Sequence, residues 1–277
     1  MYSGKWYQVK DAMKPQDFFD KHQVFTYEEF VSAVESKGKR TRDAILTYYV
    51  KTGRLLNIRR GLYAAVPSGM FPEKRPVDHY LIGSKLTNDA ILAYHTALEL
   101  HGKAYSVREN VTYLTGKRSR PLSFQGCIFK AVSFPRVLKE KHLENFGVTR
   151  IERVGVDVRV TGHERTLVDV LNRPDLAGGW EEIWRSLESV EFFDLDRVVE
   201  YALLLDNSTT AAKVGFYLEQ HRKTLMVSKN HLDKLRSIRP RMPHYMVRNG
   251  RKSGRLMKEW NLVVPVQIIE RSWEEIR

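Results

Sequence analysis

Acidic side chains occur at two places in the sequence where phosphoryl-transfer or nuclease chemistry could be sought. Asp194 and Asp196 form a carboxylate pair of the kind that holds Mg²⁺ during nucleotidyl transfer. The nearest Gly-Ser pair, Gly83-Ser84, lies far upstream, whereas the compact signature of such enzymes needs it close to the acids. Residues 35–37 read Glu-Ser-Lys, the letters of a nuclease motif, but they end a predicted helix instead of following a strand. We therefore interpret Asp194 as a helix cap.

Histidines and glycines give no stronger case for a metal or a cofactor. His95 and His101 are six positions apart, whereas two histidines that bind one metal from a helix are four apart. His163 has no cysteine or carboxylate at a metal-ligand spacing. Residues 250–254, Gly-Arg-Lys-Ser-Gly, lack the earlier glycine of a phosphate-binding P-loop. We expect neither a metal nor a cofactor, and we find no positive evidence for an enzyme.

A third group of charges, in "GHERTLVDVLNRP", has helical spacing. Arg165 and Asp169 lie four positions apart on one helical face, which favours an intrahelical ion pair over catalysis. Glu164 is near the predicted start of the same helix, where the helix dipole favours a negative charge.

Positive charge is the feature of the composition that points to a partner. The chain of 277 residues carries 46 Lys and Arg against 33 Asp and Glu, a net charge of +13. Such a balance favours polyanions, namely DNA, RNA or anionic lipid. Residues 37–60 hold eight basic residues and a single acid, Asp43. A solvated basic face would have the same composition, so the predicted elements have to decide between the two readings.

Two helices are predicted ahead of this basic stretch. The first begins at Pro15, a residue type favoured in the first helical turn. The second is capped by Thr26, and Glu29 follows at the spacing of a capping box. Phe30 and Val34 contribute to its apolar stripe.

The basic stretch itself is predicted to form a helix and a hairpin. We place the helix over residues 42–52, with Thr41 as its N-cap and Gly53 as its end. A strand rhythm follows, with Arg59-Arg60-Gly61 at the tip of a hairpin. The expected apolar face of the helix is Ala44, Ile45, Tyr48 and Tyr49. The opposite face, expected to meet DNA bases, is Arg40, Asp43, Thr47 and Val50.

Three helices followed by a β-hairpin are the elements of a winged helix-turn-helix, in which one helix enters the major groove and basic groups hold phosphates. A basic run is often only a solvated face, and a tyrosine pair is often core. The order of the elements nevertheless favours DNA binding. The candidate DNA contacts are Lys39, Arg40, Thr41, Arg42, Thr47, Lys51, Arg59 and Arg60.

Prolines and glycine break the chain between residues 66 and 78, which predicts two domains. Residues 1–68 form the winged helix-turn-helix domain, and residues 77–277 form a larger mixed domain, so the fold class is α+β. In the second domain we expect a helix over 90–102 capped by Asn88 or Asp89, helices capped by Asp194 and Ser208, and a final strand over 261–269.

A second basic block covers residues 222–258, with twelve Lys and Arg against one acid, Asp233. It could be a second polyanion surface, which includes a contact with RNA, or a flexible solvated segment. The single cysteine, Cys127, excludes an internal disulfide and fits a reducing compartment. No signal peptide and no membrane span are recognised in the sequence, so we expect a soluble cytoplasmic protein.

Blocks along nearly the whole chain resemble AbiEi-type antitoxins of type IV toxin-antitoxin (abortive infection) systems. The N-terminal block is "FTYEEF…RTRDAILTYYVKTGRLLNIRRGLYA". The C-terminal blocks are "ILAYHTALELHG", "TGHERTLVDVLNRPDLAGGWEEIWRSLE", "AAKVGFYLE" and "WNLVVPV". The resemblance implies that the N-terminal domain binds repeats upstream of its own operon and represses it. It also implies that the C-terminal domain counteracts a nucleotidyltransferase-like toxin without forming a stable complex.

The positions that match the family blocks in the C-terminal domain carry no assigned chemistry. They are His95, His101, Glu164, Arg165, Thr166, Asp169, Gly178 and Gly179. Two other functions remain open from the sequence. The chain could be a nuclease that the winged helix targets to DNA, or an RNA- or nucleotide-binding antitoxin that shields the target of the toxin.

Overall fold

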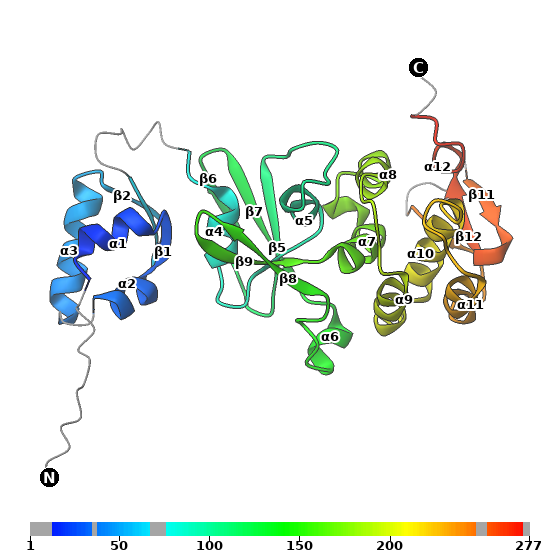
Figure 1. Ribbon diagram of the computed structural model, residues 1–277, viewed down its shortest axis with the longest axis horizontal. Helices are drawn as coiled ribbons and strands as arrows, with labels where there is room; N and C mark the ends of the chain where they lie inside the picture. Colours follow the sequence, from blue (N-terminus) through cyan, green and yellow to red (C-terminus); the bar gives the residue numbers. More distant parts are fainter. Residues whose placement is uncertain (1–12, 35–37, 67–75, 248–253, 274–277) are drawn as a thin grey trace, which may run out of the picture.

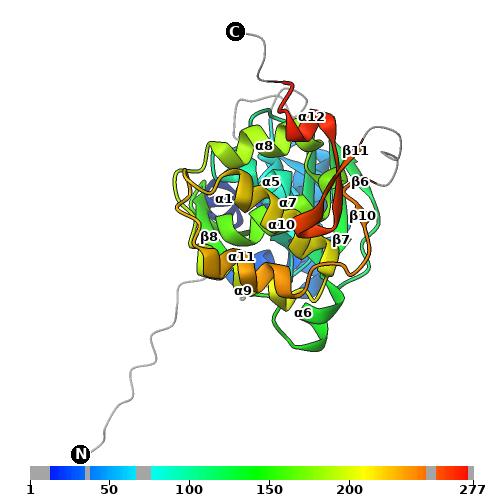
Figure 2. The same ribbon diagram turned by 90° about the vertical axis from the view of Figure 1, so that its right-hand side faces the viewer.

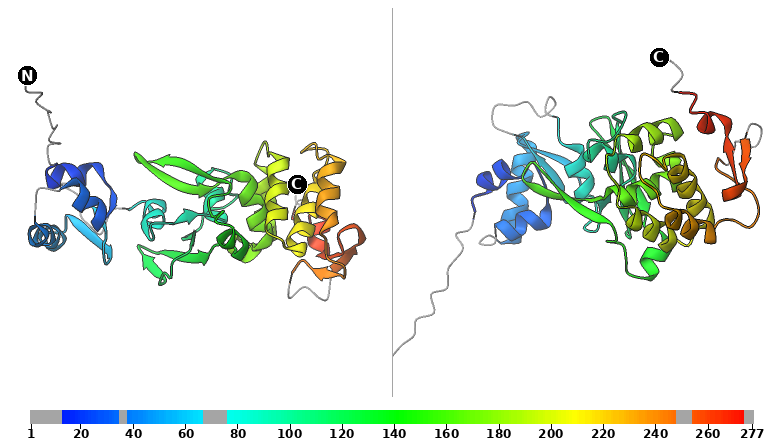
Figure 3. Two further views of the ribbon diagram at one scale, coloured as in Figure 1. Left: turned by 90° about the horizontal axis from the view of Figure 1, so that it is seen from below. Right: turned by 45° about the vertical axis from the view of Figure 1, so that its right-hand side comes forward.

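The computed structural model describes residues 13–34, 38–66, 76–247 and 254–273, and these form a mixed α+β structure. Figure 1 shows three groups of elements in a row: a small N-terminal unit, a central sheet with its helices, and a helical part with a small C-terminal sheet. The views in Figure 3 show the same order from two other directions. The predicted joint lies mostly at residues 67–75, outside the described residues.

The N-terminal unit packs three helices against a three-stranded antiparallel sheet of order β1-β3-β2. Four phenylalanine rings, Phe18, Phe19, Phe25 and Phe30, stack or meet edge to face in its core. Its elements are α1 (Pro15–Lys21), β1 (Val24–Thr26), α2 (Tyr27–Ala33), α3 (Lys39–Lys51), β2 (Leu55–Arg59) and β3 (Leu62–Ala65).

Local signals in this unit are largely confirmed. Helix α1 begins at Pro15, and the Thr26 hydroxyl accepts from the Glu29 amide while the Glu29 carboxylate accepts from the Thr26 amide, as a capping box requires. Gly53 adopts a φ of 71° after α3. The N-cap predicted at Thr41 is wrong. Helix α3 begins at Lys39 after Gly38, so Thr41 already lies in the first turn, where its own amide bonds to the Gly38 carbonyl.

The central sheet has the order β6-β7-β5-β4-β9-β8 and mixes both pairing directions. β5 pairs parallel to β7 and β4 parallel to β9, whereas β4–β5, β6–β7 and β8–β9 are antiparallel. Its strands are β4 (Ile91–Leu92), β5 (Asn110–Thr115), β6 (Leu122–Phe124), β7 (Cys127–Ser133), β8 (Val148–Arg153) and β9 (Val156–Thr161). The accompanying helices are α4 (His79–Lys85), α5 (His95–Leu100) and α6 (Arg136–Glu140).

The helix predicted over 90–102 is wrong in its first half. Ile91 and Leu92 form strand β4, which is fully buried between β5 and β9, and the helix starts only after Tyr94, whose φ is 58°. Asp89 does not cap a helix. Its carboxylate accepts from the Thr115 hydroxyl and the Gly116 amide, each at 2.7 Å. A short apolar run fits a buried strand as well as a helix, and only the neighbouring strands decide.

The helical part follows the sheet, and Figure 2 views it end on. Its elements are α7 (His163–Asn172), a 3-10 turn (Pro174–Leu176), α8 (Trp180–Glu188), α9 (Leu195–Leu204), α10 (Ser208–Gln220) and α11 (Lys229–Ser237). The C-terminal elements are β10 (His244–Tyr245), β11 (Gly254–Met257), a 3-10 turn (Lys258–Trp260), β12 (Leu262–Pro265) and α12 (Val266–Ile269).

Two boundaries in this part differ from the prediction, and one is confirmed. The Asp194 carboxylate caps α9 as predicted. Helix α10 is capped by Asn207, whose side chain accepts from the Thr210 amide, not by Ser208. The predicted final strand ends at Pro265, because proline cannot donate to a strand pairing, and α12 follows.

One hydrophobic cluster joins the N-terminal unit to the central sheet. Val24, Ile58 and Leu62 of the small sheet belong to the same cluster of buried side chains as Leu81 of α4 and Val158 of β9. The opposite face of the small sheet packs on the phenylalanine core. The hairpin β2–β3 is therefore held on both faces, which fixes its position relative to the central sheet.

Candidate functional site

Helix α3 turns one long face to solvent. Leu46 is its only fully buried side chain, and Ile45, Tyr49 and Val50 are half-buried beside it. The exposed residues are Lys39, Arg40, Thr41, Asp43, Ala44, Thr47, Tyr48 and Lys51. Arg40, Asp43 and Thr47 are exposed as predicted, but the predicted helix rotation is partly wrong. Tyr48 is 62% exposed and belongs to the outer face, whereas Val50 belongs to the inner one.

Two polar contacts fix the exposed face of α3. The Tyr27 hydroxyl donates to the Asp43 carboxylate at 2.7 Å, which ties α3 to the start of α2. The Thr47 hydroxyl donates to the Asp43 carbonyl at 2.8 Å. The Thr47 proton is thereby used inside the helix, and its oxygen lone pairs and methyl group remain for a base edge.

Arg42 differs from the other predicted contact residues. Its side chain is half-buried, and its Nε atom is shielded from water without a hydrogen-bond partner among the described residues. Arg42 therefore lies at the border of the exposed face of α3, not at its centre.

The hairpin β2–β3 stands next to α3. A bulge at Asn57/Arg59 and a φ of 80° at Gly61 shape its tip, and the Gly61 carbonyl accepts from the Tyr27 amide at 2.8 Å. Arg60 is exposed and Arg59 half-buried, and neither guanidinium has a hydrogen bond or ion pair within the described ranges. The structure thus brings the predicted basic residues of hairpin and helix together in one small unit.

A groove of about 370 Å³ separates helix α3 from the hairpin. Its lining includes Asp43, Thr47 and Lys51 from the helix and Asn57 and Tyr63 from the hairpin. Sequence reasoning missed Asn57 and Tyr63. A signal was present, because both are polar positions in alternating strands, but only the packing shows that they face α3.

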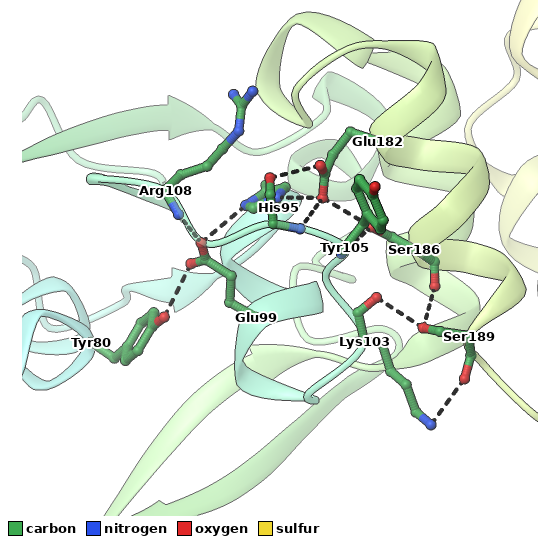
Figure 4. Close-up of polar contacts among 10 residues, drawn as sticks. Tyr80, His95, Glu99, Lys103, Tyr105, Arg108, Glu182, Ser186 and Ser189 are labelled. Carbon is green, nitrogen blue, oxygen red and sulfur yellow. Dashed lines mark hydrogen bonds and ion pairs between the residues drawn. The ribbon is translucent and has the colours of Figure 1, made fainter. Parts of the chain in front are cut away.

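His95, one of the positions singled out by the sequence resemblance, is buried in a polar network (Figure 4). Its ring is 1% exposed, and its two nitrogens face Glu182 at 3.0 Å and Glu99 at 3.2 Å. Glu182 also accepts from the Ser106 amide and hydroxyl at 3.0 and 2.7 Å. Burial raises the pKa of Glu182, but the hydrogen bonds from Ser106 and His95 outweigh it and hold the pKa below its usual range.

This network ties separate elements to one another. Glu99 accepts from the Tyr80 hydroxyl of α4 at 3.1 Å and from the Arg108 amide at 2.8 Å. Gly178, with a φ of 89°, brings the backbone so close that an added Cβ would stand 2.9 Å from the Arg108 guanidinium and from Glu182. Gly179 has a φ of 100° and starts α8. The contacts of His95, Glu99 and Glu182 thus connect α4, α5 and α8, and Gly178 leaves room for them.

Arg165 and Asp169 form the predicted intrahelical ion pair, with Nε 3.4 Å from Oδ2 and both side chains buried. Asp169 also accepts from the Tyr201 hydroxyl at 2.9 Å. Arg165 donates to the carbonyls of Glu144 and Phe146 at 2.8 and 2.7 Å. Both Asp169 oxygens accept hydrogen bonds within the core, and the carboxylate is buried away from solvent. The neighbouring Thr166 hydroxyl meets that of Thr161 at 2.7 Å.

His101 and His163 come together at a surface pocket of about 500 Å³, with ring centroids 4.3 Å apart. The His101 Nε2 bonds to the Thr161 carbonyl at 2.8 Å. Glu164, at the start of α7, accepts from the Asp194 amide at 3.2 Å. Among the described residues, no group of three or more His, Cys, Asp or Glu side chains could hold a metal ion.

The histidine pair predicts a stability loss in mild acid. Burial lowers the pKa of His101 and of His163, so the unfolded chain, whose histidines titrate near 6.5, binds their protons first as pH falls. The two neutral histidines therefore contribute fully to the stability of the fold above a pH of about 6.5, and this contribution is lost as the pH falls below that value. We expect a lower urea midpoint at pH 5.5 than at pH 7.5, and a smaller difference in His163→Gln. The exposed His142→Gln is the matched control, and an equal difference in all three proteins would contradict the expectation.

The second basic block is partly folded, which corrects one alternative from the sequence. Residues 229–237 form α11, with Leu232 and Leu235 buried, so this part is not a flexible segment. Arg236 pairs with Glu219 at 2.7 Å and Asp233 at 3.1 Å and lies over the Trp260 ring. Residues 250–253 of the rejected P-loop candidate, and residues 35–37 of the nuclease-like triplet, lie outside the described residues.

Comparison with known proteins gives one finding about the fold. No protein-family model matches the chain, and no curated protein matches its sequence. Among solved structures, the chain is similar to the crystal structure of the Rv2827c protein from Mycobacterium tuberculosis, at 18% identity and a TM-score of 0.61. The match covers 92% of this chain and 91% of that chain. The two proteins share a fold.

The fold shared with Rv2827c spans both the small N-terminal unit and the larger remainder, because the match covers nearly all of each chain. At this level of identity the likeness concerns architecture alone. None of the described helices has both the length and the apolar composition that crossing a bilayer requires.

Proposed function

We propose that the chain is a DNA-binding antitoxin that represses its own operon. The N-terminal unit would be a winged helix-turn-helix, with α2 and α3 as the helix pair and β2–β3 as the wing. The observation that carries the proposal is the long exposed face of α3, which has Lys39 and Arg40 at one end and Lys51 at the other. A helix with a free face about this long is what a major groove admits.

The contacts divide into two kinds under this proposal. Arg40 and Thr47 meet base edges, because arginine forks onto guanine and threonine contacts a base through its hydroxyl or methyl group. Lys39, Lys51, Arg59 and Arg60 meet phosphates, which position the protein without reading sequence. Thr41 and Arg42 border the same face.

Binding to the DNA upstream of its own gene tests the proposal. The affinity should exceed that for unrelated DNA of equal length. With ~6 phosphates engaged, the logarithm of the affinity should fall against the logarithm of the salt concentration with a slope of about −5. Arg60→Ala should weaken binding to both DNAs alike and flatten the slope by about 1. Gel shifts at several salt concentrations measure this. Equal affinity for both DNAs would contradict autoregulation.

The antitoxin part of the proposal rests on the resemblance of the C-terminal blocks. The positions that match the family blocks form or adjoin the buried networks around His95 and Asp169, which fits a role in shaping the domain. The partner would be a nucleotidyltransferase-like toxin of the same operon in the cytoplasm, with no stable complex. Restored growth on co-expression with that neighbouring gene, without co-elution of the two proteins, would support it. A stable complex would argue against the type IV arrangement.

A further inference from the structure

A second concave surface lies between the N-terminal unit and the central sheet. This inter-unit cleft has a volume of about 730 Å³. The hairpin β8–β9 reaches toward the N-terminal unit there, as Figure 3 shows. The basic residues that line the cleft come from both parts of the chain and are Arg59, Arg60, Lys85, Lys117, Arg118 and Arg159. The acids in its lining are Glu28, Glu29 and Asp157.

Most of the acids and two of the bases are already engaged. Lys85 pairs with Glu29, and Arg159 donates to the Asn145 side chain. Asp157 lies 3.5 Å from Arg150.

Four cations of the cleft remain, two from each side. The side chains of Arg59, Arg60, Lys117 and Arg118 have no hydrogen bond or ion pair with any described residue. Lys117, Arg118 and Arg60 are exposed, and Arg59 is half-buried. Like charges gathered in a concave surface repel one another, and an anion bound there would relieve the repulsion.

The two walls of the cleft are fixed relative to each other. The hydrophobic cluster that contains Ile58 and Leu62 also contains Leu81 and Val158 from the other wall. Lys117 and Arg118 follow Gly116, whose amide is held by the Asp89 carboxylate. The four cations therefore stand on a pre-formed surface, which reduces the cost of ordering them when a ligand binds.

The cleft borders the groove beside α3. Tyr27 lines the groove, and its neighbours Thr26 and Glu28 line the cleft. The Tyr27 amide bonds to the Gly61 carbonyl at 2.8 Å, so the hairpin tip, which lines the cleft, lies beside Tyr27. The two concavities therefore meet at Tyr27, and one continuous polyanion is expected to contact both.

The lining of the cleft selects the kind of anion. Among the described residues, none of those that line it is aromatic, so it has no ring on which a free base could stack. Lys117 offers an exposed ammonium and Arg118 an exposed guanidinium fork, and both groups suit phosphodiester oxygens.

We propose that the cleft binds the sugar-phosphate backbone of the DNA beside the segment that α3 reads, with Lys117 and Arg118 as contacts from the C-terminal part of the chain. This inference rests on the proposed function. The DNA-binding surface then includes a loop of the central sheet, which places the central sheet next to the operator whenever the N-terminal unit is bound.

The test compares two double variants of the full chain on the upstream DNA. Lys117→Ala with Arg118→Ala should flatten the salt slope by about 2 and weaken binding by about tenfold or more at 0.1 M salt. Lys139→Ala with Lys141→Ala is the matched control. It removes two positive charges from exposed positions at the end of α6, whose residues line neither the cleft nor the groove, and should leave the slope unchanged.

Each other outcome is informative. A wild-type slope in the Lys117/Arg118 variant would overturn the cleft proposal and leave DNA binding intact. An equal change in both double variants would overturn it as well, because net charge alone would then explain the effect. If the wild-type protein does not bind its upstream DNA, the proposed function itself is wrong. The wild type could also bind a nucleoside triphosphate tightly. If only the Lys117/Arg118 variant loses this binding, the cleft is a site for a free nucleotide and not for DNA.

Discussion

Replacing Asp169 with alanine lowers the free energy of unfolding by about 3–5 kcal/mol, the expected cost of removing one partner from a buried ion pair. Asp169 is 1% exposed. Its loss removes the carboxylate that faces the buried Arg165 guanidinium, whose charge then keeps only carbonyl and ring contacts among the described residues. It also leaves the buried Tyr201 hydroxyl without its acceptor.

The loss of stability in Asp169→Ala is large because the Arg165 side chain cannot rotate out into solvent. Two of its hydrogen bonds go to the Glu144 and Phe146 carbonyls, its guanidinium lies 5.4 Å from the centre of the Tyr201 ring, and its side chain is buried. An arginine is not deprotonated to escape burial, so the charge stays.

Asp175→Ala is the control for this change. Asp175 pairs with Arg173 at 2.9 Å, but both side chains are about half exposed, and such a pair contributes about 0–1 kcal/mol. Urea unfolding of the two variants and the wild type, at the same pH, measures the difference. Similar stabilities of Asp169→Ala and Asp175→Ala would show that the buried pair has no special weight.

Replacing Arg40 with alanine is expected to weaken binding to the upstream DNA by about 1–3 kcal/mol, while binding to unrelated DNA falls much less. Arg40 is exposed near the start of α3, and no described residue bonds to or pairs with its guanidinium. A base contact discriminates between sequences, so the ratio of specific to nonspecific affinity should drop.

Two comparisons sharpen this prediction. Arg60→Ala, at the hairpin tip, should weaken both DNAs alike and preserve the ratio. Arg197→Ala removes an exposed helical arginine from α9 and should change neither affinity. Arg42 is a poor choice for this test because its side chain is half-buried and its loss would disturb packing. If Arg40→Ala leaves the ratio of specific to nonspecific affinity unchanged, Arg40 of α3 does not contribute to sequence recognition.

Short-range signals in the sequence predicted local structure well. The capping box of Thr26 and Glu29, the cap at Asp194 and the helix end at Gly53 involve residues within four positions of each other, and the structure confirms all three. The rotation of α3 was harder, because tyrosine is compatible with either face. The Tyr48 side chain is exposed to solvent, while Leu46 takes the buried position in the phenylalanine core.

The error in the helix predicted over 90–102 also arose because the local sequence is compatible with two structures. The segment "AILAYHTALELHG" is apolar enough to be helical throughout. Its first residues nevertheless form strand β4, because they pair with β5 and β9. The information that decides this lies in segments far along the chain.

The sequence by itself determined the basic charge, the order of helices and hairpin in the first 66 residues, and the α+β class, because propensities, caps and periodicity act between near neighbours. The tertiary structure alone decided which side chains are accessible. His95 is buried against Glu182, eighty-seven positions later, and the hairpin residues Arg59 and Arg60 share a cleft with Lys117 and Arg118. Burial and charge clustering depend on distant segments meeting, and no local pattern of residue types encodes that meeting.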